Sequence, residues 1–127
     1  MKHVFSALII GAAFAAAQAH AACDYPVAPG AFPDGSLATK EEMLAAKGQV
    51  VKYNTEMDSY LGCIKTEYDA SVAALTNPTK DQLGKLEKTQ TQKQDAAIKE
   101  VTDVTERFNV QLRAWKAKNT SPEKKPS

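Results

Sequence analysis

Two long stretches of the chain carry apolar residues at helical spacing. Between Thr39 and Leu75 the apolar side chains recur after alternating steps of three and four residues. This spacing places them on one face of an amphipathic helix that is suited to pairing with another helix. The positions are Met43, Ala46, Val50, Tyr53, Met57, Tyr60 and Ile64. We therefore predict a first helix over residues 39–75.

Local sequence signals mark the start of this helix and of a second one. Thr39 is followed three residues later by Glu42, which is the capping-box pattern of a helix N-terminus. Pro78 interrupts the apolar pattern, because proline cannot continue a helix. Thr79 begins another capping box, so we expect a second helix over residues 80–118. Its apolar set is Leu83, Leu86, Ala97, Val101, Val104, Phe108, Leu112 and Trp115.

Two long helices joined by a short turn must pack antiparallel. The sequence thus predicts an all-α fold, a coiled-coil-like two-helix hairpin over residues 39–118. Leu44, Val51 and Leu61 widen the apolar stripe of the first helix beyond what a two-helix seam needs. We therefore expect a third layer, formed by the preceding segment of the chain, by a partner subunit or by a ligand.

The segment 22–38 is rich in proline and glycine and is not expected to be helical. Its prolines favour an extended or polyproline II backbone. We predict that this segment folds back along the first helix and reaches Cys63. Gly62, the neighbour of Cys63, would let the returning backbone approach closely.

Cys23 and Cys63 are the two cysteines of the chain. An even number of cysteines in an exported protein indicates a disulfide bond. Closing a loop of about 40 residues would stabilise the fold by about 4 kcal/mol. Two free buried thiols are one alternative. A lipoprotein acylated on Cys23 is another, although the residues before Cys23 lack a leucine and acylation would leave Cys63 without a partner.

Residues 1–21 have the features of a secretory signal peptide. A positive charge near the N-terminus precedes an apolar run over residues 4–17, which is shorter than the roughly 20 residues that span a bilayer. Ala19 and Ala21 form a small-x-small motif, which predicts cleavage before Ala22. An uncleaved anchor is the alternative. After cleavage we expect a periplasmic or secreted protein without stable membrane insertion.

Cleavage changes the charge and the available chemistry of the chain. The full sequence has 16 Lys and Arg against 15 Asp and Glu, so losing Lys2 leaves a formally neutral protein. A neutral balance gives no general attraction to nucleic acid. Both histidines, His3 and His20, lie in the predicted signal peptide. We therefore expect no imidazole-based catalysis, no metal site and no cofactor.

Carboxylates remain as candidate catalytic groups. Glu56, Glu67 and Asp69 could act as acid and base or bind a hard cation. They alternate with lysines such as Lys52 and Lys65 along one helix. Ion pairs on a solvated helix face explain this pattern better. We therefore predict that the protein is not an enzyme.

The sequence offers one candidate binding face. Tyr53, Tyr60 and Tyr68 are spaced seven and eight residues apart and share a helix face. They either pack in the seam or form a row that binds a flat ligand, a glycan or a peptide. The polar stretch 87–95 is expected to lie opposite Tyr60 and Tyr68. It is either packed there through shared hydrogen bonds or splayed open as a cleft.

Three further positions carry packing expectations. Gly48 lies within the first helix and is expected to make room for Phe108 of the facing helix. Trp115 should seal the end of the hairpin near Met43. The polar stretch 119–127 is predicted to be a disordered tail.

One resemblance bears on the compartment. The chain opens with Cys23-x-x-Pro26-x-x-Pro29, continues with Pro33-Asp34-Gly35 and enters the helix at Glu41-Glu42-Met43. This string resembles small secreted proteobacterial proteins of unknown function and covers residues 23–63. The resemblance implies export and no particular activity.

The sequence therefore predicts an exported, non-enzymatic helical protein of the cell envelope. We expect it to act as an interaction module that binds a protein partner or a second copy of itself. A binder of a small ligand or peptide near Tyr60 and Tyr68 is one alternative, and a lipoprotein anchored through Cys23 is another. An enzyme that relies on carboxylates alone is a third.

Overall fold

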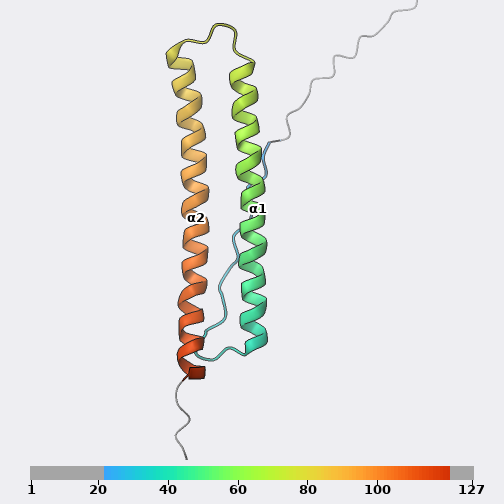
Figure 1. Cartoon of the computed structure of the whole chain (residues 1–127), viewed down its shortest axis with the longest axis vertical. Coiled ribbons are helices and arrows are strands. Elements are labelled where there is room, and N and C mark those ends of the chain that lie inside the picture. The colour runs from blue at the N-terminus through green and yellow to red at the C-terminus, as the bar shows by residue number, and fades with distance from the viewer. Residues whose placement is uncertain (1–21, 121–127) are drawn as a thin grey trace, which may run out of the picture.

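The computed structural model describes residues 22–120, which form two long helices joined by a short turn (Figure 1). Helix α1 spans Lys40–Ala73 and helix α2 spans Lys80–Thr120. The helices lie side by side and run in opposite directions. No strand occurs in the described part of the chain. The all-α antiparallel hairpin predicted from the sequence is confirmed.

Helix α1 begins where the capping box predicts and ends two residues early. Thr39 is the N-cap: its hydroxyl accepts from the Glu42 amide at 3.2 Å, and the Glu42 carboxylate accepts from the Thr39 amide at 2.7 Å. The helix ends at Ala73 rather than at Leu75. The Leu75 amide donates to the Val72 carbonyl, so the last turn tightens before the chain reverses.

Helix α2 continues two residues beyond the predicted end. Asn119 Nδ2 donates to the Trp115 carbonyl at 2.7 Å, and Thr120 Oγ1 donates to the Lys116 carbonyl at 2.7 Å. In each bond the acceptor lies four residues before the donor, so both side chains bond back along the helix, as Asn and Thr within a helix can. The prediction of disorder is therefore wrong for Asn119 and Thr120. The rest of the predicted tail and the predicted signal peptide lie outside the described residues.

Residues 22–38, which we call the N-terminal arm, form the third layer of the molecule. The arm runs back antiparallel to α1 along the valley between the two helices (Figure 1). A disulfide joins Cys23 to Cys63 with a Cα–Cα distance of 5.8 Å and a sequence separation of 40. The predicted fold-back and disulfide are both confirmed. A loop of this length contributes about 4 kcal/mol in the chain-entropy account.

Exposure along the arm repeats every three residues, from Cys23 to Phe32. A polyproline II segment has three residues per turn, so every third side chain shares a face. The half-buried positions on one face are Cys23, Pro26, Pro29 and Phe32, and the exposed positions on another are Asp24, Val27 and Gly30. The spacing of the prolines thus turns Pro26 and Pro29 toward the helices.

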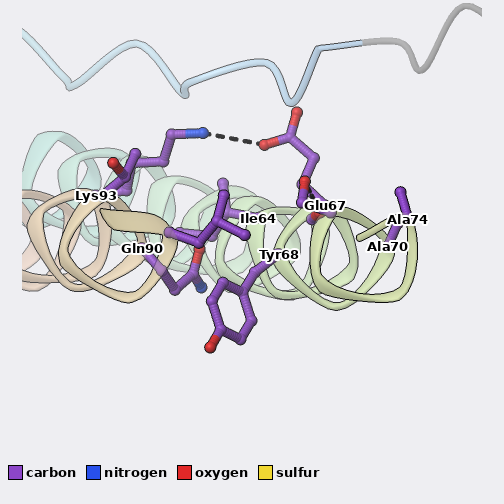
Figure 2. A pocket seen from close by; sticks show the side chains of 10 residues that line it. Ile64, Glu67, Tyr68, Ala70, Ala74, Gln90 and Lys93 are labelled. Atoms are coloured by element: carbon purple, nitrogen blue, oxygen red, sulfur yellow. Dashed lines mark hydrogen bonds and ion pairs between the residues drawn. The ribbon is translucent and has the colours of Figure 1, made fainter. Parts of the chain in front are cut away.

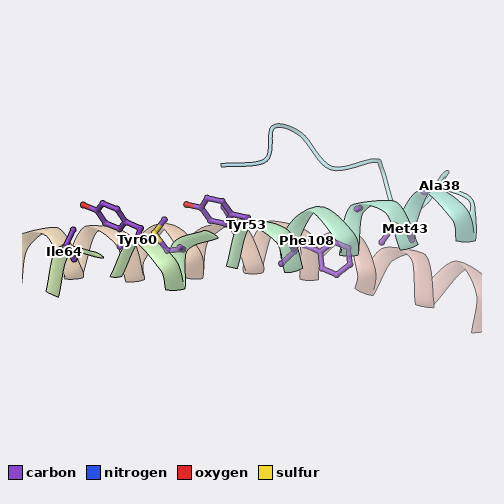
Figure 3. Packing of buried hydrophobic residues seen from close by; sticks show 11 residues of the cluster. Ala38, Met43, Tyr53, Tyr60, Ile64 and Phe108 are labelled. Carbon is purple, nitrogen blue, oxygen red and sulfur yellow. The ribbon is translucent and has the colours of Figure 1, made fainter. Parts of the chain in front are cut away.

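The core is a single row of side chains along α1 that the other two layers cover (Figure 3). All seven predicted seam positions of α1 are buried, and Met57 is completely inaccessible. Helix α2 contributes fewer buried residues: Ala97, Val104 and Phe108. The arm completes the core, because Phe32 packs edge-on against Phe108 and Tyr25 packs edge-on against Tyr60.

Two glycines do not have the packing roles expected of them. A Cβ atom placed on Gly48 or Gly62 would meet nothing within 4 Å. Both glycines are exposed, since they lie on the face of α1 that points away from α2 and the arm. Gly48 therefore makes no room for Phe108, and Gly62 makes none for the arm.

The close approach occurs at Gly35 instead, in the turn that follows the arm's prolines. A Cβ atom on Gly35 would lie 1.8 Å from the Gln111 carbonyl oxygen. The Gly35 amide donates to the Gln111 side-chain oxygen at 2.9 Å. Trp115 is half-buried against the core cluster at this end of the hairpin, as predicted. Glycine at position 35 thus lets the arm pack directly on α2.

The arm covers only one flank of α1. Leu44 and Val51 each remain 56% exposed, whereas Leu61 is half-buried. The apolar residues that led us to expect a third layer are therefore not the ones that the arm covers. It covers Tyr60 and the neighbouring Cys63 on the other flank.

We expect opposite effects from the same substitution at two glycines. Gly48→Ala should raise the free energy of unfolding by about 0.5–1 kcal/mol, because alanine is the better helix former and the site is open. Gly35→Ala should lower it by about 1–3 kcal/mol, because the added methyl group collides with α2. Urea unfolding of the oxidised protein measures both. Similar effects at the two positions would contradict this packing.

Candidate functional site

The arm divides the tyrosine row that the sequence offered as a binding face. Tyr53 and Tyr60 are 1% and 8% exposed. The Tyr25 ring covers Tyr60, with ring centroids 4.8 Å apart. Tyr68 lies past the end of the arm and is half-buried. The three rings therefore do not form one surface, and the arm already occupies the place at Tyr60 where a flat ligand was expected.

A phenol–carboxylate contact fastens the arm to α2. The Tyr25 hydroxyl donates to Glu100 Oε2 at 2.6 Å. Burial raises the pKa of Tyr25 well above its ordinary range, and the hydrogen bond to Glu100 raises it further. Burial also raises the pKa of Tyr53, which feels the negative charge of the same carboxylate. Both phenols stay protonated at neutral pH, so this cluster holds the arm and offers no phenolate base.

Arg107 of α2 holds the next part of the arm. Its guanidinium donates to the carbonyls of Gly30 at 3.0 Å and Pro29 at 3.1 Å. The same group lies over the Phe32 ring, 5.6 Å from the centroid. A polyproline II backbone has no internal hydrogen bonds, so its carbonyls need outside donors. The arm was predicted to fold back on α1, yet most of its polar anchors belong to α2.

Toward the connecting turn, beyond the disulfide, no segment among residues 22–120 fills the valley between the helices. This open groove has a volume of about 440 Å³ and lies between the disulfide and the connecting turn (Figure 2). Its apolar lining consists of Ile64, Tyr68, Ala70, Ala74 and Leu86. Its polar lining consists of Glu67, Ser71, Thr89, Gln90 and Lys93. The groove is therefore a mainly apolar trough with polar walls.

An ion pair spans the two walls of the open groove. Lys93 Nζ lies 3.0 Å from Glu67 Oε2, and both side chains are partly buried. Figure 2 shows this pair on the side of the hairpin where the arm runs, with Tyr68 turned to the opposite side. The Gln90 amide nitrogen is buried without a hydrogen-bond partner.

The polar stretch 87–95 sits closer to the connecting turn than predicted. Its residues Thr89, Gln90 and Lys93 line the open groove together with Ile64 and residues 67–74. It does not reach Tyr60, because that side chain faces the arm. A groove is present at this stretch, and the Lys93–Glu67 ion pair joins its two walls.

The candidate carboxylates are engaged in ion pairs on the helix surfaces. Glu56 pairs with Lys52, and Asp69 pairs with Lys65 at 2.6 Å. Glu67 is the partner of Lys93 described above. Among residues 22–120, no group of three or more His, Cys, Asp or Glu side chains comes together in a way that could hold a metal ion.

Sequence reasoning missed three residues that hold the arm: Glu100, Arg107 and Gln111. They lie seven and four residues apart on one side of the α2 seam. Arg107 donates to carbonyls of the arm, whereas Glu100 accepts from the Tyr25 hydroxyl and Gln111 accepts from the Gly35 amide. The available signal was the set of polar residues in register beside the seam, which can supply both donors and acceptors to a segment laid against the helix.

Comparisons with family models, with characterised proteins and with solved structures find no match to this chain. Neither helix in the described region is long and apolar enough to cross a membrane. The disulfide indicates an oxidising compartment outside the cytoplasm. It also uses the sulfur that acylation of Cys23 would need, so the structure favours the disulfide over the lipoprotein alternative.

The Tyr25–Glu100 contact predicts a loss of stability at alkaline pH. The pKa of Tyr25 is raised in the folded state, so the stabilisation is complete below its ordinary pKa of 10.0 and is lost as the pH rises beyond it. The urea midpoint of the oxidised protein should therefore stay level from about pH 8 to pH 9 and fall from about pH 10 to pH 11. The urea midpoint of the Tyr25→Phe variant should fall less over the same pH range. Tyr68→Phe is the matched control, and its urea midpoint should fall as much as that of the natural protein.

Proposed function

We propose that this chain is an exported, non-enzymatic interaction module of the cell envelope that binds a partner protein in the open groove. The observation that carries the proposal is the continuity of the valley. One part of it is filled by the arm, and the next part has the same helical walls and a mainly apolar lining, with no covering segment among residues 22–120. An apolar trough of this kind is a common place for a partner to dock.

The rigidity of the surrounding structure supports a binding role. The disulfide fixes the end of the arm beside the groove, and Arg107 and Glu100 hold the arm to α2. The Glu67–Lys93 pair links the two walls of the groove. A site that is already ordered loses less entropy on binding. The disulfide and the signal-peptide features of residues 1–21 together support a periplasmic or secreted location.

A small-ligand binder is the second candidate, and the size of the groove favours it. A volume of about 440 Å³ falls within the range of small-molecule sites. The groove is nevertheless a trough along two helices, which suits a chain-like ligand better than a compact one. Self-association is the other form that a protein partner can take, since Leu44 and Val51 are exposed.

Site-specific photocrosslinking tests the proposal. A photoreactive phenylalanine analogue at Thr89 stands in the wall of the open groove, whereas the same analogue at Thr91 is exposed elsewhere on α2. In the producing cell we expect a polypeptide adduct from position 89 and none from position 91. Equal labelling at both positions, or no adduct at either, would contradict a protein-binding groove.

A further inference from the structure

The arm shows what kind of ligand this helix pair accepts. It is an extended segment whose half-buried prolines face the helices and whose rings pack on Tyr60 and Phe108. Residues 26–33 carry no charge. Proline-rich peptides bind aromatic-lined grooves of other proteins in the same manner, because their preformed backbone loses little entropy. The arm therefore binds the helix pair of its own chain in the way that a proline-rich peptide binds another protein.

The polar positions that hold the arm continue into the open groove. Glu100 and Arg107 contact the arm and are seven residues apart on α2. Lys93 lies seven residues before Glu100, so it occupies the next equivalent position on the same face of the helix. Figure 2 places Lys93 on the arm's side of the hairpin. Lys93, paired with Glu67, therefore stands beside the course that a segment extending the arm would take.

The length of the groove suits a short extended occupant. From Ile64 to Ala74 the wall is about 15 Å long at the helical rise per residue. A polyproline II segment covers 15 Å with about five residues.

We propose that the open groove binds an extended, proline-containing and uncharged peptide segment of a partner protein, which continues the course of the arm. The inference rests on the proposed function and names the chemistry of the partner. Apolar side chains of the segment lie on Leu86 between the alanines of α1 and Thr89 of α2. The Glu67–Lys93 pair is formally neutral, which suits a segment without charge.

A peptide that copies residues 26–33 is the probe, because the arm itself defines the pattern. Its fluorescein-labelled form is titrated with the oxidised protein, in which the disulfide keeps the natural arm in place, and anisotropy reports binding. The control peptide has its three prolines replaced by alanine. We expect saturable binding with a Kd below about 1 mM. We expect at least tenfold weaker binding of the control peptide.

Two protein variants locate the site. Thr89→Arg places a long charged side chain in the groove wall and should weaken peptide binding at least tenfold. Thr91→Arg makes the same change at an exposed position outside the groove and should leave binding unchanged. Ala70→Arg, in the opposite wall, should behave as Thr89→Arg does. Helical content by circular dichroism checks that each variant is folded.

Three results would overturn the inference: no binding of the probe, equal binding of the alanine peptide, or binding that Thr89→Arg and Ala70→Arg leave unchanged. The crosslinking experiment separates this failure from that of the proposed function. An adduct at position 89 that maps to a helical segment of the partner would support the protein-binding groove and contradict the proline-containing ligand. Absence of both the adduct and peptide binding would contradict both proposals.

Discussion

Two helices that pack side by side bury only one stripe each, and a chain of this size needs a further apolar layer to form a stable core. The N-terminal arm supplies that layer. Its aromatic rings lie on Tyr60 and Phe108, and the disulfide to Cys63 holds it in the valley. The rest of the structure depends on this contact. Without it, buried tyrosines and the flank of Phe108 would face water.

The arm can fill the valley because its backbone is compatible with a helical surface. A strand would need a neighbouring strand for its amides, whereas prolines remove donors, and side chains of α2 satisfy some of the carbonyls. Arg107 binds two carbonyls at once and stacks over an arm ring. The same arrangement explains why the valley beyond Cys23 remains a groove. The disulfide marks where the described arm ends, and the polar stretch of α2 does not close the gap.

Much of the fold could be predicted from the sequence, because its determinants are local or periodic. The apolar spacing of α1, the capping box at Thr39 and the break at Pro78 each have a direct physical meaning, and each was located correctly. The disulfide was predicted because the sequence indicates export and contains two cysteines. Helix ends were less certain, since Asn119 and Thr120 extend α2 beyond the last apolar position of its pattern.

The helix face on which a residue lies, and the helix that it contacts, were harder to predict. Gly48 was assigned to the interface because glycine in a helix usually needs a packing reason, yet it lies on the outer face. The arm was matched to α1 through its cysteine, while its polar partners lie on α2. The cysteine pair predicted where the arm ends. The residues that line the groove beyond that point follow from three-dimensional packing and not from any motif.

Nuclear Overhauser effects between aromatic rings test the central claim most directly. In the oxidised protein in solution, this account predicts cross-peaks between the Phe32 and Phe108 rings and between the Tyr25 and Tyr60 rings, whose centroids lie 5.6 Å and 4.8 Å apart. Absence of both sets of cross-peaks, with helical content unchanged, would contradict it. The hairpin would then stand without its third layer, and the valley would be open along its whole length.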